Sequence, residues 1–350
     1  MWYWAAMCSL TPKDLPPTSK LKPVTEDTHK KLLLLYSQET SEASEAMRLL
    51  VQEFPSELRC RPLDLERLMQ VWILNCFEHT DEPLGYATYF MSSFMSHSCR
   101  PNSLWHYDGD DFILRARERI QAGDEITVSY LSEDVLLDAT VARRKHLKDS
   151  KHFICRCPRC SDPCDPCRGF RCPSCSSISL KFGAPQGDED YVGATAMFGR
   201  RCEHCFHVLD FGQAALLQAE ESLLEHRIEE TEKCLQEKGF DAPDKELHKR
   251  LERLVQRVEK SLAQHYMLDK AYQLLSDLAS RLQWEEDAER MMRKRMEYQA
   301  QSYAGLSGSA AWTWEAYGDM LLRHARCEVD PEVKVPDIAA AIKVQQTVPG

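Results

Sequence analysis

Cysteines are the residues whose spacing most clearly predicts chemistry in this chain. Nine of its 15 cysteines lie between residues 155 and 205, several of them in close pairs. Cys172 and Cys175 form one C-x2-C pair, and Cys202 and Cys205 form another. Two such pairs supply the four thiolates of a tetrahedral structural zinc site and leave no open position for catalysis. The spacing therefore predicts a zinc ribbon.

A second group of thiols is incomplete. Cys155, Cys157 and Cys160 supply three thiolates from one short loop, one fewer than a structural zinc needs, so the fourth ligand must come from elsewhere in the chain. Cys164 and Cys167 also form a C-x2-C pair, but no second pair is left to complete it. We therefore expect these two to be spectator thiols.

Size and charge narrow the class of protein. The 350 residues are enough for two or three domains, and the net charge of -11 argues against direct nucleic-acid binding while suiting a basic, lysine-bearing partner. The apolar residues 1–7 are too short to span a bilayer, and no secretory segment is expected, so no membrane partner is expected either. Clustered thiols without a signal peptide indicate a reducing compartment, which predicts a cytoplasmic and/or nuclear protein.

The elements around these residues are mixed. Residues 1–25 show no periodic apolar face and are expected to form an N-terminal arm. Between residues 26 and 77, apolar side chains recur every three or four positions, with interruptions at Pro55 and Pro62, which predicts several short helices. A further short helix is expected around residues 143–147.

Strand signals follow the helical stretch. Residues 103–107 and 112–117 flank the turn sequence Asp108-Gly109-Asp110-Asp111, which predicts a β-hairpin. Residues 126–130 are expected to form a third short strand after the turn at Gly123.

From Phe211 onward the pattern is helical again. Residues 251–262 and 268–282 each carry an amphipathic face. Ala271-Tyr272 and Ala316-Tyr317 lie in comparable helices, which suggests antiparallel helix pairs of the tetratricopeptide type.

Four motifs carry a resemblance to a known family. They are Asn75-Cys76-Phe77, Ser96-His97-Ser98-Cys99-Arg100-Pro101-Asn102, Gly123-Asp124-Glu125-Ile126-Thr127-Val128-Ser129-Tyr130 and Cys155-Arg156-Cys157-Pro158-Arg159-Cys160. Together they resemble the C-terminal half of a SET lysine methyltransferase domain, most closely that of the SET and MYND domain family, over roughly residues 30–325. The resemblance implies an α+β fold: a partial β-rich SET domain with a helical insert, a zinc-binding post-SET loop, a zinc ribbon and an all-α tetratricopeptide-like domain.

These expectations divide the chain into six segments. They are an arm (1–25), a helical SET insert (26–85), the SET C-terminal half with its post-SET zinc site (86–160), a zinc-ribbon segment (161–210), the tetratricopeptide-like helices (211–325) and a tail (326–350).

The resemblance also implies a function. It predicts a protein-lysine N-methyltransferase that uses S-adenosylmethionine (SAM), binds about two zinc ions and acts on a histone or non-histone protein. The roles it implies are Tyr130 and Phe77 at the lysine channel, Asn75, Ser96 and His97 at the cofactor, Phe153 stacked on adenine, and Cys99 as the fourth ligand beside Cys155, Cys157 and Cys160.

Such a reaction needs a neutral lysine amine. With a reference pKa near 10.4, a lysine amine costs roughly 4–5 kcal/mol to deprotonate at pH 7. A desolvated aromatic channel lowers that cost, and the hydroxyl of Tyr130 could orient the amine lone pair.

The glycine distribution keeps other interpretations open. Gly85 is the first glycine in the chain, so we expect the Gly-rich SAM turn, with the N-terminal SET half and the MYND finger, to be missing here. One alternative is a catalytically inactive SET, zinc and helical-repeat protein that binds peptides or proteins as a scaffold. The other is a fragment of a longer enzyme.

Overall fold

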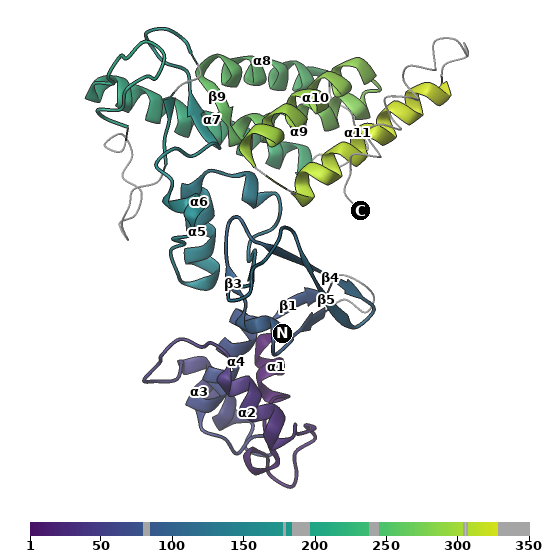
Figure 1. Cartoon of the computed structure of the whole chain (residues 1–350). Coiled ribbons are helices and arrows are strands. Elements are labelled where there is room, and N and C mark those ends of the chain that lie inside the picture. The colour runs from purple at the N-terminus through teal and green to yellow at the C-terminus, as the bar shows by residue number, and fades with distance from the viewer. Residues whose placement is uncertain are drawn as a thin grey trace. The chain divides into compact units, whose positions relative to one another are not determined.

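The computed structural model describes residues 1–79, 85–177, 180–183, 197–237, 245–303, 305 and 307–327. The chain divides into two compact units, 1–128 and 129–350. The first contains short helices and small sheets, and the second contains Cys-rich turns followed by helices (Figure 1). The architecture is the α+β arrangement expected from the sequence.

Four short α-helices build the core of the first unit. They are α1 (Trp2–Met7), α2 (Glu26–Leu34), α3 (Glu45–Glu53) and α4 (Pro62–Asn75), with 3-10 turns η1 (Pro12–Asp14) and η2 (Ser92–Phe94). Thr25 and Ser44 cap α2 and α3 through their hydroxyls, while Pro62 starts α4 at a position where no N–H is needed. The expected series of short helices is therefore confirmed.

The first residues are not the expected arm. Helix α1 packs against α4, and Ala6 and Leu10 are almost fully buried in the same core as Leu65 and Leu68. The Trp72 indole also donates to the Ser9 hydroxyl (2.8 Å). The apolar stretch at residues 1–7 is too short to show a helical period in sequence. It is helical and ordered because it packs against α4, about 60 residues later in the chain.

Small sheets complete the first unit. Its strands are β1 (Phe77–His79), β2 (Gly85–Ala87), β3 (Ser96–His97), β4 (Ser103–Asp108), β5 (Asp111–Ala116) and β6 (Thr127–Val128). β4 and β5 form the expected hairpin, with Asp108 opposite Asp111 and Gly109 at φ +59° in the turn. The strand expected over 126–130 is shorter, and it pairs in parallel with β3.

The second unit starts with turns and short elements. They are η3 (Val135–Leu137), α5 (Thr140–Lys151), α6 (Pro158–Ser161), β7 (Arg168–Phe170) and β8 (Leu180–Lys181). Helix α5 includes the helix expected around residues 143–147.

Helices form the rest of the second unit. They are α7 (Phe211–Glu237), α8 (Lys245–Ser261), α9 (Tyr266–Arg281), α10 (Glu285–Ser302) and α11 (Gly308–Cys327). α9 packs on α8 and α10, as Figure 1 shows. The tail expected from residue 326 lies almost wholly outside the described residues.

A strand interrupts the helical series unexpectedly. β9 (Leu262–His265) separates α8 from α9 and pairs antiparallel with β7. The three-stranded sheet β8-β7-β9 therefore contains two strands from the Cys-rich segment and one strand from the helical region. The approach is close enough that a Cβ on Gly169 would lie 2.1 Å from the Ala263 carbonyl oxygen. Only glycine fits at that position.

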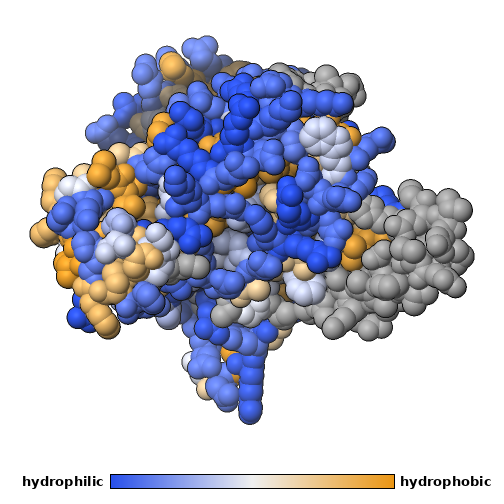
Figure 2. Space-filling model, turned by 90° about the horizontal axis from the view of Figure 1, so that it is seen from above, coloured by the Kyte–Doolittle hydropathy of each residue, from blue (hydrophilic) through white to orange (hydrophobic). Residues whose placement is uncertain are grey.

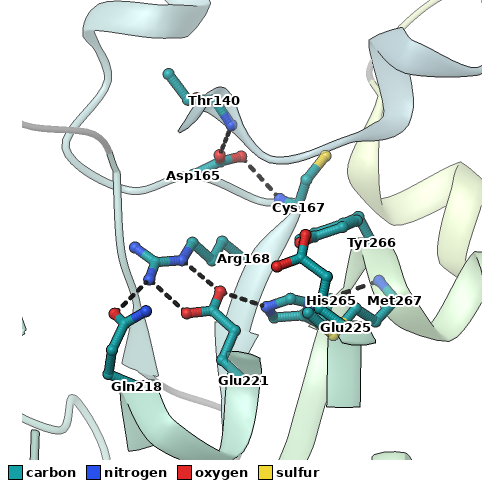
Figure 3. Close-up of polar contacts among 10 residues, drawn as sticks. All are labelled: Thr140, Asp165, Cys167, Arg168, Gln218, Glu221, Glu225, His265, Tyr266 and Met267. Atoms are coloured by element: carbon teal, nitrogen blue, oxygen red, sulfur yellow. Dashed lines mark hydrogen bonds and ion pairs between the residues drawn. The ribbon is translucent and has the colours of Figure 1, made fainter. Parts of the chain in front are cut away.

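A buried ionic network joins these elements (Figure 3). Arg168 on β7 donates from Nε and Nη2 to the two carboxylate oxygens of Glu221 on α7, at 2.7 and 2.6 Å. His265 on β9 contacts the same carboxylate through Nε2, at 3.1 Å. Because the Met267 N–H donates to Nδ1 of His265, Nε2 carries the proton and donates to Glu221.

The network sets the ionisation of Glu221. Burial by itself disfavours the carboxylate, but the hydrogen bonds from Arg168 and His265 outweigh that effect and hold the pKa of Glu221 at about 2. All three side chains are at least 90% buried. A charged glutamate is therefore maintained inside the unit.

The surface over the helices is ordinary for a water-exposed face. Seen from above, hydrophilic residues cover most of it, with hydrophobic residues gathered mainly toward one edge (Figure 2). Among the described residues, no helix is both long and apolar enough to cross a membrane.

Substituting Glu221 by Gln should destabilise the second unit by about 3–5 kcal/mol, because Arg168 would lose its buried counter-charge. Guanidinium unfolding followed by circular dichroism measures the change. Glu230→Gln on the same helix is the control, since its partner His226 is exposed, and should cost less than about 0.5 kcal/mol. Equal effects in the two variants would show that the network does not stabilise the fold.

The same network predicts a pH dependence. The pKa of Glu221 is lower in the folded state than its ordinary 4.5, so its contribution is complete above pH 4.5 and is lost as the pH falls toward 2. The difference corresponds to about 3 kcal/mol. Stability of the Glu221→Gln variant should therefore fall less steeply than that of the wild type over this range, and parallel curves would contradict the assignment.

Candidate active site and cysteine clusters

One group of four thiols lies wholly within the second unit. Cys172, Cys175, Cys202 and Cys205 place their sulfur atoms within 4.8 Å of one another. The Cys172–Cys205 and Cys175–Cys202 sulfur pairs are each 3.7 Å apart. Tetrahedral zinc with Zn–S bonds of about 2.3 Å requires S–S separations of about 3.8 Å. The donor set and its dimensions therefore fit zinc.

The two cysteine pairs sit in equivalent turns. In each, the residue after the second cysteine has positive φ, 58° at Ser176 and 61° at Phe206, and its N–H donates to the carbonyl of the first cysteine. A left-handed conformation costs a non-glycine residue roughly 1–2 kcal/mol. Its occurrence at the same place in both turns indicates a shared geometric requirement, which is to aim two thiols at one point.

The thiols of this group do not ionise alike. The hydroxyl and backbone of Ser177 lower the pKa of Cys175 to about 7. The backbone of His207 lowers the pKa of Cys205, but burial and the neighbouring thiols outweigh it and raise that pKa to about 11. A bound cation would favour all four thiolates over this partly protonated state.

A second candidate group within the second unit comprises Cys155, Cys157 and Cys160. The three sulfur atoms of the second unit lie within 4.8 Å of one another. Arg144 on α5 holds their loop by donating to the carbonyls of Cys155 (3.0 Å) and Cys160 (3.2 Å). The loop is thus shaped by a neighbouring helix.

The remaining pair behaves differently. Cys164 is exposed, whereas Cys167 is fully buried and accepts a hydrogen bond from Arg159 at 3.2 Å. Burial raises the pKa of Cys167. Neither residue joins a metal-type cluster among the residues that the structure describes.

Tyr130 lies in the second unit, with Phe153 against it. The two rings are perpendicular, with centroids 6.3 Å apart. The Ser129 hydroxyl donates to the Leu131 carbonyl and accepts from the Leu131 N–H, which fixes the turn around Tyr130. The Lys151 ammonium lies 5.8 Å from the centre of the same tyrosine ring. Residues expected at the amine and at adenine are therefore neighbours.

In the first unit, the segment around His97 is fixed by strand pairing. β3 lies beside β6, and the Ser98 N–H donates to the Val128 carbonyl (3.0 Å). Ser96 donates its hydroxyl to Glu125 (2.5 Å), and His97 Nε2 lies 3.3 Å from the buried Cys99 sulfur.

Asn75 and Phe77 also lie in the first unit. Asn75 is buried and donates its side-chain NH2 to the carbonyls of Val71 and Tyr36, both at 2.8 Å. Phe77 contacts the rings of Tyr89, Trp105 and Phe112, at centroid distances of 5.0 to 6.0 Å. Phe77 therefore belongs to an aromatic cluster on the β4–β5 hairpin.

Sequence reasoning missed the residues that position these groups. Asn102 accepts from the Thr127 N–H (2.8 Å) and donates to the Glu125 carbonyl (2.8 Å), so it fixes the segment that leads to Tyr130. Arg143 and Arg144 were placed only on a helix. Two adjacent arginines on the helix that leads into a Cys-rich loop are the available signal for the role of Arg144.

Comparisons with known proteins agree with these observations. The SET domain family model matches residues 16–131. Relatives include the SET domain-containing protein SmydA-8, isoform B, of Drosophila melanogaster, 36% identical over 37% of this chain and 28% of its own length. Histone-lysine N-methyltransferase SMYD3 of Mus musculus is 38% identical over 23% of this chain and 18% of its own length. Histone-lysine N-methyltransferase ASHR1 of Arabidopsis thaliana is 27% identical over 45% of this chain and 33% of its own length.

The chain thus spans about a third or less of the length of these relatives. The matched region contains the His97 segment and Tyr130, and the Cys-rich turns and the helices from α5 onward lie beyond it. Residues 16–131 thus match the SET domain, and the chain is similar to part of the SET and MYND domain lysine methyltransferases.

Proposed function

We propose that this protein acts as a SAM-dependent protein-lysine N-methyltransferase. The observation that carries the proposal is the contact between Tyr130 and Phe153, whose rings lie 6.3 Å apart. The resemblance assigns the amine to one of these residues and adenine to the other. Their proximity places the proposed amine site beside the proposed cofactor site, and such closeness of the two reactants favours reaction.

Each side chain has a distinct task in this proposal. Tyr130, about 39% exposed, would accept a hydrogen bond from an N–H of the amine and so leave the lone pair directed toward the methyl donor. Phe153 would stack on adenine, and the aromatic surroundings would favour the neutral amine by excluding water. SAM, when bound, supplies an electrophilic methyl group.

In the first unit, the side-chain donors proposed to face SAM already make hydrogen bonds within the protein. Asn75 uses both hydrogens of its amide on backbone carbonyls, and Ser96 uses its hydroxyl hydrogen on Glu125. Either residue would therefore meet a cofactor only as an acceptor, for example of a hydroxyl or ammonium hydrogen. His97 would contribute its ring.

Zinc is proposed at both cysteine groups. Cys172, Cys175, Cys202 and Cys205 would hold a structural ion with no open position. Cys155, Cys157 and Cys160 would hold a second ion with Cys99 as the fourth ligand, and that ion would stiffen the loop two residues after Phe153.

The proposed substrate is a lysine-bearing protein, histone or non-histone, which the net charge of -11 would attract. Two of the relatives are named histone-lysine methyltransferases. A cytoplasmic and/or nuclear location follows as part of the same proposal.

A scaffold without catalysis is the second candidate. It is favoured by the engagement of Asn75 and Ser96 within the protein, since both donors expected at the cofactor are already used. In that case the aromatic and helical surfaces would bind a partner protein without transferring a methyl group.

Isothermal titration with SAM separates the two candidates. The proposal predicts saturable binding that S-adenosylhomocysteine displaces, and Phe153→Ala should weaken it by about tenfold or more because the stacking surface is lost. Phe198→Ala, at an exposed phenylalanine of the same unit, is the control and should bind normally. No heat with the wild-type protein would favour the scaffold.

Tyr130→Phe tests the reaction itself. Loss of the hydroxyl should reduce methyl transfer from labelled SAM to mixed core histones by at least about a hundredfold. SAM affinity should remain unchanged. The exposed Tyr36 provides a matched Tyr→Phe control that should keep full activity. A fully active Tyr130→Phe protein would remove the role given to this residue.

Metal analysis tests the cysteine assignments. The purified chain should contain about two zinc ions, and Cys202→Ser should lose one of them and unfold the ribbon turns. Cys164→Ser should retain both, since that thiol is exposed and outside the clusters. A third zinc that disappears in Cys164→Ser would instead make Cys164 a ligand.

A further inference from the structure

Lys151 is a charged residue for which the proposed mechanism has no use. It is the last residue of α5, and its ammonium lies 5.8 Å from the centre of the Tyr130 ring, within the range of a cation–π contact. Tyr130 is also the residue proposed to orient the substrate amine. A positive charge thus stands beside the place where a second amine must arrive.

The backbone holds this arrangement in place. His152 follows Lys151 in a left-handed conformation, φ 62° and ψ 31°, and its N–H donates to the Lys148 carbonyl. The next residue is Phe153, which contacts the same Tyr130 ring. A non-glycine residue in this conformation is disfavoured, and it persists where surrounding structure requires it. The turn at His152 lets two neighbouring residues contact one tyrosine.

The charge affects the two forms of a lysine amine differently. A protonated amine brought to Tyr130 is repelled by the Lys151 ammonium, whereas a neutral amine is not. Methyl transfer requires the neutral form, because the lone pair forms the new N–C bond as the S–C bond of the sulfonium breaks. The released methylated amine then carries the charge.

We propose that Lys151 is a specificity-determining residue that disfavours the ammonium form of the acceptor at Tyr130 and leaves binding of an uncharged side chain unaffected. This inference rests on the proposed function, since it takes Tyr130 to be the amine site. Lys151 would act on the substrate amine through the repulsion between their charges and would not touch the reacting atoms.

The test compares two small probes on three proteins. Nα-acetyl-lysine methylamide and Nα-acetyl-norleucine methylamide, an uncharged analogue that lacks the terminal amine, are titrated at neutral pH into the wild type, Lys151→Met and Lys151→Arg, with affinities measured by ligand-observed NMR. Lys151→Met removes the charge at nearly constant length, and Lys151→Arg is the matched control that keeps it. Thermal unfolding of each variant verifies that the fold is retained.

The wild type and Lys151→Arg should both bind the norleucine probe about fivefold or more tighter than the lysine probe. Lys151→Met should reduce this preference to about twofold or less by tightening the lysine probe alone. An unchanged preference in Lys151→Met would overturn the inference but leave the proposed function standing. Absence of binding by either probe to all three proteins would overturn both.

With a methylated product to measure, the kinetic pattern gives a second readout. Lys151→Met should lower KM and kcat for a lysine substrate by a similar factor, because a more favourable ammonium complex is an unreactive one. A purely structural role would lower kcat/KM instead. Lys151→Arg should leave both constants near those of the wild type, and a fall in kcat/KM for Lys151→Met alone would contradict the proposal.

Discussion

The buried carboxylate of Glu221 is the constraint on which the second unit depends. It receives two hydrogen bonds from Arg168 on β7 and one from His265 on β9, so a single charge joins a helix to two strands far apart in sequence. Breaking a buried pair leaves an uncompensated charge, which costs more than the pair itself contributes. The network therefore fixes which strand lies beside β7, and so connects the Cys-rich turns to the helical core.

Backbone strain marks the other positions where this unit places chemistry. Among the described residues, five non-glycine residues have positive φ, and four of them adjoin groups discussed above. Ser176 and Phe206 follow the ribbon cysteines, His152 separates Lys151 from Phe153, and Gln264 precedes His265. Left-handed residues persist where the surroundings over-determine them. Their distribution is consistent with turns shaped to aim particular side chains.

Local signals predicted much of the fold. The hairpin of β4 and β5 follows from a glycine turn between alternating residues, and α2 to α4 follow from apolar periodicity with prolines at the breaks. The C-x2-C spacing of the cysteine pairs likewise predicted the zinc-ribbon turns. These features depend on interactions between residues within about ten positions of one another, and such local patterns can be recognised in a single sequence.

Features that depend on distant partners could not be predicted. β9 lies inside an amphipathic pattern and becomes a strand only because β7, some 95 residues earlier, pairs with it past Gly169. Glu221 resembles any glutamate on a surface helix until Arg168 is known to face it. Helix α1 is too short to show a helical repeat of apolar residues in sequence, and it is ordered because it is buried against α4. For the site, the types of Tyr130 and Phe153 were visible in sequence, but the position of Lys151 over the tyrosine ring was not.

The proposed methyl transfer takes place where Tyr130 and Phe153 meet, beside the loop of Cys155, Cys157 and Cys160. Photochemical crosslinking with methyl-labelled SAM, followed by peptide mapping, tests this claim most directly. The label should fall on the peptides containing Tyr130 or Phe153 and disappear when S-adenosylhomocysteine is added. Label confined to other peptides, or no competable label at all, would contradict it.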